Sequence, residues 1–136
     1  MDKTYCSSRN SIFNINYHIV WAVKYRKPIL VGKIEEYLKQ LLLNTIPNNK
    51  DFKVQVCEVM PDHVHVFVSA PPKIAPGYIV KMLKGISGRL LFIEFPEIES
   101  SLWRGRLWSS SYFVETIGST SEEAVRKYIE NQKSRG

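Results

Sequence analysis

Two histidines separated by one residue are the side chains of this sequence best suited to metal chemistry. His63 and His65 lie in the segment 62–69, DHVHVFVS. Side chains alternate along a strand, so both imidazoles point to one face while the valines between them point to the other. A strand holds two such ligands a few ångströms apart with little freedom to lose, which favours a metal site. Taken alone, such a pair is more often two histidines on a solvated face than a metal site.

The C-terminal segment offers a tyrosine and a candidate oxygen ligand on one helical face. Ser119 and Glu122 have the spacing of a capping box, which predicts a helix that continues to about Gln132. Tyr128 and Gln132 are one helical turn apart, so they share a face of that helix. The glutamine carbonyl oxygen can then join two imidazoles as a third ligand, with Tyr128 beside the metal. The alternatives are an aromatic that packs the helix down and an exposed amide.

This set of donors restricts the choice of metal. His63, His65 and Gln132 supply two nitrogens and one oxygen and leave positions open for phosphate and water. Mg²⁺ or Mn²⁺ fits, because a bound phosphate supplies hard oxygens, and Zn²⁺ is also compatible. A tyrosine has a reference pKa near 10 and needs activation at neutral pH. The nearby cation is the expected source of that activation, since no certain general base is evident.

The charge balance favours a polyanionic partner. Nineteen Lys and Arg against thirteen Asp and Glu give a net charge of +6. Basic residues are mixed with aromatic ones, as suits single-stranded nucleic acid, whose phosphates need charge and whose bases need stacking surfaces. Candidate DNA contacts, each also compatible with a solvated surface, are His18, Lys24, Arg26, Lys27, Arg89, Arg104 and Arg106. Trp103 and Trp108 could stack bases, or Trp108 could belong to the core or an interface.

Other classes fit the sequence less well. The basic clusters do not lie on one amphipathic helix, and no apolar run approaches the roughly 18 residues of a membrane span. The N-terminus lacks the apolar core of a signal peptide, so we expect a cytoplasmic protein without membrane attachment. Cys6 and Cys57 form no CxxC pair and are interpreted as free thiols.

Hydrophobic periodicity predicts an α+β domain that spans residues 1–136. Strands are expected over 12–24, from 52 to 56, over 63–70 and over 106–116, and helices over 33–46 and from 76 to 95. In the first strand His18 shares a face with Asn14 and Asn16, opposite the apolar residues. This order is a ferredoxin-like split β-α-β-β-α-β, whose antiparallel sheet has helices on one face, followed by the C-terminal helix that carries the tyrosine.

These segments together resemble the single-tyrosine HUH transposases of minimal bacterial and archaeal insertion sequences, where HUH denotes two histidines around a hydrophobic residue. The matching segments span nearly the whole chain: YHIVW at 17–21 with KYR at 24–26, MPDHVH at 60–65, KG at 84–85 with SGR at 87–89, LW at 107–108 with YFVETIG at 112–118, and YIENQ at 128–132. The histidine pair is common by itself, whereas its combination with a downstream YIExQ helix is specific.

The resemblance implies a chemistry and an assembly. Tyr128 would attack a scissile phosphate of single-stranded DNA, giving a 5′-phosphotyrosine link and a free 3′-hydroxyl, and a later 3′-hydroxyl would reverse the step on a new partner. The expected DNA partner is a hairpin-forming end of a mobile element. The expected assembly is a homodimer with composite active sites, in which the tyrosine helix of one subunit faces the histidines of the other, and Gly118 offers a hinge for that exchange.

Two functions from other classes stay open on the sequence. One is a non-catalytic single-strand binder on a ferredoxin-like sheet, which would place aromatics at stacking positions on the open face. The other is an HxH metal-dependent phosphoesterase, such as a zinc hydrolase, which predicts a carboxylate near the metal and no covalent intermediate. Within the transposase class, a domesticated enzyme that processes chromosomal repeats is a further variant.

Overall fold

The computed structural model describes residues 15–102 and 105–117. The elements follow one another as β1 (Ile15–Ala22), the 3₁₀ turn η1 (Lys24–Arg26), α1 (Lys33–Gln40), its π-helical continuation η2 (Leu41–Thr45), β2 (Lys53–Met60), β3 (His63–Ala70), α2 (Pro76–Glu94), the 3₁₀ segment η3 (Pro96–Ser101) and β4 (Phe113–Ile117). The predicted C-terminal helix, with Tyr128 and Gln132, lies outside the described residues, as does Arg104.

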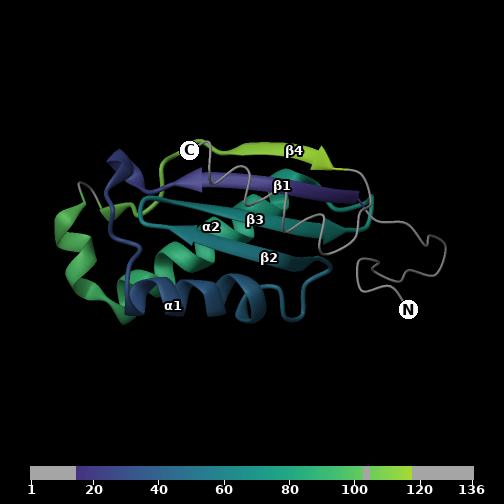
Figure 1. Cartoon of the computed structure of the whole chain (residues 1–136). Coiled ribbons are helices and arrows are strands. Elements are labelled where there is room, and N and C mark those ends of the chain that lie inside the picture. The colour runs from purple at the N-terminus through teal and green to yellow at the C-terminus, as the bar shows by residue number, and fades with distance from the viewer. Residues whose placement is uncertain (1–14, 103–104, 118–136) are drawn as a thin grey trace.

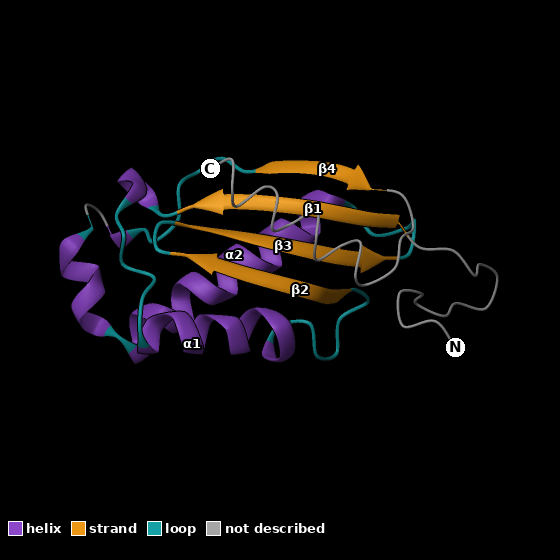
Figure 2. Ribbon diagram, in the orientation of Figure 1, coloured by secondary structure: helices purple, strands orange, loops and turns teal. Residues whose placement is uncertain are grey.

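The four strands form one sheet in the order β2-β3-β1-β4, and every neighbouring pair is antiparallel. This is the strand order of the split β-α-β, so the predicted ferredoxin-like fold is confirmed. Figure 1 shows α2 crossing behind the central strands with α1 along the β2 edge, and Figure 2 gives the same arrangement by element type. No helix in the described part of the chain is both long and apolar enough to cross a membrane.

Strand alternation separates a core face from an open face. The side chains of Ile19, Val64, Val66 and Val68 are fully buried in one cluster that also contains the apolar side of both helices. Burying each of these valines contributes roughly 1.5–3 kcal/mol. The alternate positions, including both histidines of β3, therefore face away from the helices.

The helices begin and end where local chemistry requires. Gly32 precedes α1 with φ +61°, a conformation that strains residues with a side chain. Proline at the first turn of α2 uses a position whose backbone N–H has no partner in the helix. Within α2, a Cβ on Gly88 would touch the Trp108 ring at 3.4 Å, an ordinary packing distance, and a Cβ on Gly85 would have nothing within 4 Å.

The fourth strand is shorter than the sequence predicted. Instead of running over 106–116, the chain makes one isolated bridge between Trp108 and Val23 and joins the sheet only at Phe113. The ammonium of Lys84 on α2 donates to the carbonyl oxygens of Ser109 at 2.6 Å and Ser111 at 3.3 Å. The Ser109 N–H still donates to the Ala22 carbonyl of β1 at 2.9 Å, and beyond this bond the chain is held to α2 until it pairs with β1 again at Phe113.

Candidate active site

All three histidines of the chain lie together on the sheet face opposite the helices, and the side chains of His18 and His65 are buried there. His63 and His65 have ring centroids 5.0 Å apart, and His18 stacks on His65 with centroids 5.2 Å apart and rings tilted by 8°. Antiparallel pairing of β1 with β3 produces this cluster, because it sets Val20 opposite His65 and Phe67 opposite His18. The predicted common direction of the two β3 histidines is confirmed, and His18 supports one of them from the adjacent strand.

A buried chain of hydrogen bonds runs from His65 to a carboxylate. The Nδ1 atom of His65 lies 3.0 Å from Nε2 of His18, and Nδ1 of His18 lies 3.3 Å from Oε1 of Glu115. Burial lowers the pKa of His18, and the hydrogen bond and charge of Glu115 oppose this only in part. His18 is therefore neutral near pH 7, and its single N–H is the one that Glu115 can accept.

This order of donors fixes the tautomer of His65. Because His18 donates from Nδ1 to the carboxylate, its Nε2 is an acceptor, and the His65 Nδ1–H must be the donor to it. The lone pair of neutral His65 then lies on Nε2. A histidine that ligates a metal typically donates its other N–H to a carboxylate, carbonyl or similar acceptor in this way.

His63 has an equivalent support from the residue before it. Its Nδ1 donates to Oδ1 of Asp62 at 2.7 Å, and Oδ2 of the same carboxylate accepts from Nε of Arg26 at 3.0 Å. The hydrogen bond from His63 is the main cause that lowers the pKa of Asp62, with Arg26 assisting, while partial burial opposes. Asp62 is therefore ionised at neutral pH, and the lone pair of neutral His63 also lies on Nε2.

The two β3 histidines fit a divalent cation but do not complete a site for one. Both rings carry the tautomer that offers Nε2 to a metal; His63 is supported directly by the Asp62 carboxylate, and His65 is supported by His18, which contacts Glu115. In residues 15–102 and 105–117, however, no three His, Cys, Asp or Glu side chains are placed to hold a metal. His18 is engaged with His65 through its own Nε2.

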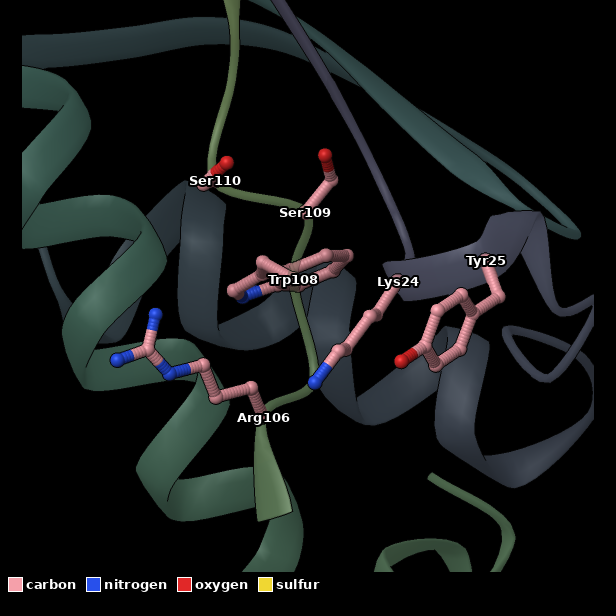
Figure 3. A pocket seen from close by; sticks show the side chains of 6 residues that line it. All are labelled: Lys24, Tyr25, Arg106, Trp108, Ser109 and Ser110. Atoms are coloured by element: carbon pink, nitrogen blue, oxygen red, sulfur yellow. The ribbon is translucent and has the colours of Figure 1, made fainter. Parts of the chain in front are cut away.

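The basic candidates divide into several groups. Lys24 and Arg106 line one hollow together with Tyr25 and Trp108 (Figure 3). Arg26 binds Asp62 and so supports the His63 end of the site. Lys27 and Arg89 are exposed on the surface. Of the predicted DNA-binding residues that the structure describes, it therefore places only Lys24 and Arg106 in a common hollow.

Trp108 belongs mainly to the core. Its ring meets Trp21 edge to face with centroids 5.7 Å apart, and its indole N–H donates to Oγ of Ser87 at 3.1 Å. It is only 8% exposed, so it can form the wall of a pocket but does not project as a stacking platform. Trp103 lies outside the described residues.

Sequence reasoning missed Glu115 and gave Asp62 no role. The sequence could have indicated a role for Asp62, since this residue directly precedes the histidine pair. The sequence indicated a role for Glu115 less clearly. Glu115 shares a face of its strand with Phe113, but no local pattern shows that this strand pairs with the strand that carries His18. Tyr25, in the hollow, had appeared only as an aromatic among basic residues.

Comparisons with known proteins find relatives over most of the chain. Residues 11–132 match the family described as "Transposase IS200 like". The ISDra2 transposase TnpA of Deinococcus radiodurans is 40% identical over 124 residues, covering 91% of this chain and 88% of that protein. The transposase for insertion sequence element IS200 of Salmonella typhimurium is 28% identical over 120 residues, covering 88% of this chain and 78% of that protein.

Solved structures support the same assignment. A crystal structure from Deinococcus radiodurans R1, assigned as a transposase, superimposes with a TM-score of 0.75 at 36% identity, covering 93% of this chain and 96% of the other. A REP-associated tyrosine transposase, bound to a REP hairpin, shares the fold with a TM-score of 0.60 at 12% identity, covering 96% and 74%. The fold, the histidine cluster and these matches lead to one conclusion: the chain belongs to the IS200-like transposase family.

Proposed function

We propose that this transposase cleaves and rejoins single-stranded DNA by metal-assisted transesterification, with Tyr128 as the nucleophile. The observation that carries the proposal is the paired support of His63 and His65. Each donates its Nδ1–H to a neighbouring group at 3.0 Å or less, which assigns the lone pair to Nε2 of both rings. Two adjacent imidazoles oriented in this way are suited to hold a cation against a phosphate.

The proposed third ligand is the side-chain oxygen of Gln132, which shares a helical face with Tyr128. Mg²⁺ or Mn²⁺ suits this set when a phosphate supplies further oxygens, and Zn²⁺ is compatible with it. A bound ion of this kind would polarise a non-bridging oxygen of the scissile phosphate and lower the pKa of a nearby hydroxyl. The two histidines of β3 would hold the ion, with Asp62 orienting the His63 ring and His18 orienting the His65 ring.

The covalent step conserves the phosphodiester bond energy. The Tyr128 oxygen forms a bond to phosphorus as the bond from phosphorus to the 3′-oxygen breaks. The phenol proton is lost, and the leaving 3′-oxygen gains a proton to become a hydroxyl. The product is a 5′-phosphotyrosine, and attack by another 3′-hydroxyl releases the tyrosine, so rejoining needs no ATP.

The proposed partners are hairpin-forming ends of the mobile element and a second copy of the chain. The net charge of +6 suits a nucleic acid. The homodimer would have composite sites, with the Tyr128 helix of one subunit opposite the histidines of the other. A non-catalytic binder or an HxH phosphoesterase on the same sheet would bind DNA without forming a covalent adduct.

The test is an adduct assay with single-stranded oligonucleotides taken from the DNA that flanks the coding sequence, in Mg²⁺ or Mn²⁺. A 3′-labelled strand should give a labelled adduct that survives denaturation, and a 5′-labelled strand should give a shorter free product. Tyr128→Phe should abolish the adduct, while Tyr78→Phe, which alters an exposed tyrosine on α2, should retain it. His63→Ala and chelation should stop cleavage.

Two results would reject the proposal. An adduct as strong in Tyr128→Phe as in the wild type would exclude this nucleophile. Release of cleaved product without an adduct, persisting in Tyr128→Phe, would favour the phosphoesterase.

A further inference from the structure

A hollow of about 470 Å³ lies at the turn that follows β1. Its volume is within the range of roughly 300–1,000 Å³ typical of ligand pockets. The lining residues come from the turn after β1 and from the loop before β4: Lys24, Tyr25, Arg106, Trp108, Ser109 and Ser110. None of them is a ligand or supporting residue of the proposed metal site.

The lining combines cations with aromatic surface. Figure 3 shows the Lys24 side chain between the Trp108 and Tyr25 rings, with Arg106 on the other side of Trp108. The Lys24 ammonium is 5.3 Å from the centroid of the Tyr25 ring, and that ring belongs to a residue that is 63% exposed. An exposed ring with one cation beside it and a second cation in the same hollow matches the two parts of a nucleotide, a flat base and a charged phosphate.

The turn that presents Tyr25 has an unusual backbone. Tyr25 and Arg26 have φ values of 61° and 53°, a left-handed region that is costly for residues other than glycine. The turn is held by bonds from Arg26 N–H to the Val23 carbonyl at 2.8 Å and from Lys24 N–H to the Leu107 carbonyl at 2.8 Å. The turn thus keeps a large aromatic side chain in solvent despite the backbone strain.

The same turn is connected to the proposed metal ligands. The Asp62 carboxylate binds Arg26 through one oxygen and His63 through the other. The backbone N–H of Val23 also donates to the Asp62 carbonyl at 2.9 Å, and Ala22 pairs with His63 across the sheet. The turn that lines the hollow is therefore joined to the His63 end of the site through Asp62.

We propose that this hollow binds one unstacked nucleotide of the single-stranded DNA substrate, adjacent to the scissile phosphate. The base stacks on the Tyr25 ring, and the neighbouring phosphates contact Lys24 and Arg106. The inference deepens the proposed function, on which it rests for the identity of the ligand. It adds a base-dependent contact, whereas basic residues alone would give only a phosphate contact.

The test compares two fluorescent oligomers of equal length, oligo-dT and an abasic oligomer with the same phosphates, by fluorescence anisotropy. Tyr25→Gly removes the ring and tolerates the positive φ, so the turn should persist, and Tyr25→Phe retains the ring. We expect Tyr25→Gly to weaken oligo-dT binding about tenfold, to leave abasic binding unchanged, and Tyr25→Phe to bind both as the wild type does.

The cations give a complementary result. Lys24→Ala and Arg106→Ala should weaken binding of both oligomers and reduce the salt dependence by about one released counterion each. Lys81→Ala, which removes an exposed lysine on α2, is the control for a loss of charge and should bind as the wild type does. Circular dichroism checks that each variant is folded.

Equal binding of oligo-dT by Tyr25→Gly and the wild type would overturn the proposal, as would a loss in Lys81→Ala equal to that in Lys24→Ala. These outcomes are distinct from failure of the proposed function. Base-dependent binding with no Tyr128 adduct would reject the chemistry and keep the nucleotide site. A normal adduct with base-independent binding would reject the nucleotide site and keep the proposed chemistry.

Discussion

The hydrogen-bond chain behind His65 makes a quantitative prediction about metal affinity. His18→Ala removes the partner that His65 Nδ1 has at 3.0 Å, at a site where His18 is only 1% exposed. Loss of such a supporting partner typically reduces metal affinity 10- to 100-fold, or about 1.4–2.8 kcal/mol. Glu115→Gln acts one step further away through a side chain that is 38% exposed, so we expect about tenfold or less.

The assay is titration calorimetry with Mn²⁺, accompanied by ¹⁵N NMR of the histidine rings in metal-free protein. In the wild type the proton of neutral His65 should be on Nδ1, and in His18→Ala the Nε2–H form should become populated. Glu36→Gln, which changes an exposed carboxylate on α1, is the control and should leave both readouts unchanged. Thermal melting separates a general loss of stability from a local loss of orientation.

The reasoning would be refuted if folded His18→Ala and Glu115→Gln proteins both bound Mn²⁺ as tightly as the wild type. It would also be refuted if His65 in the metal-free wild type carried its proton on Nε2.

Three further predictions concern the scaffold. Burial raises the pKa of Cys57 to about 12 from 9.0, so in a Cys6→Ser protein the thiol should react with a disulfide reagent at pH 8 only after unfolding. Since the folded state favours the neutral thiol, its contribution to stability should be complete below pH 9 and should decline as the pH rises from 9 towards 12, as measured by denaturant titration. Gly32→Ala places a side chain at φ +61° and should destabilise by about 1–3 kcal/mol, visible as a lower Tm. Lys84→Met leaves two loop carbonyls without their ammonium partner and should cost about 1–3 kcal/mol, with weaker oligo-dT binding because that loop lines the hollow. An unchanged melting curve in either variant would contradict the role given to that residue.

Short-range patterns were sufficient for much of the fold. The alternation of histidine and valine in 62–69 predicted which side chains of β3 face the core, and Val64 and Val66 are fully buried. Proline 76 and the apolar stripe after it predicted the start of α2. These predictions succeed because periods of 2 and 3.6 residues are properties of a single element.

The end of the loop before β4 could not be predicted in the same way. Residues 106–116 have the composition of one strand, but the Lys84 ammonium binds two carbonyls there and draws the loop to α2. That interaction joins segments more than twenty residues apart, and no local pattern contains it.

The candidate site likewise combines features that the local sequence predicts with features that it does not. The sequence alone determined that His63 and His65 share a face, since both lie on one strand, and the motifs along the chain indicated a family that the comparisons confirm. The roles of Tyr128 and Gln132 remain predictions, because those residues lie outside the described part of the chain.

Only the tertiary structure decided which side chains form hydrogen bonds with those histidines. The sequence put His18 on a strand face, but its contact with His65 depends on the register between β1 and β3, and the contact of Glu115 with His18 depends on the register between β1 and β4. A shift of one residue in either pairing would turn the strand's side chains to the opposite face. Register is set by packing of the whole sheet against both helices, so the tautomer of His65 is a property of the fold, whereas its presence on the open face is a property of the sequence.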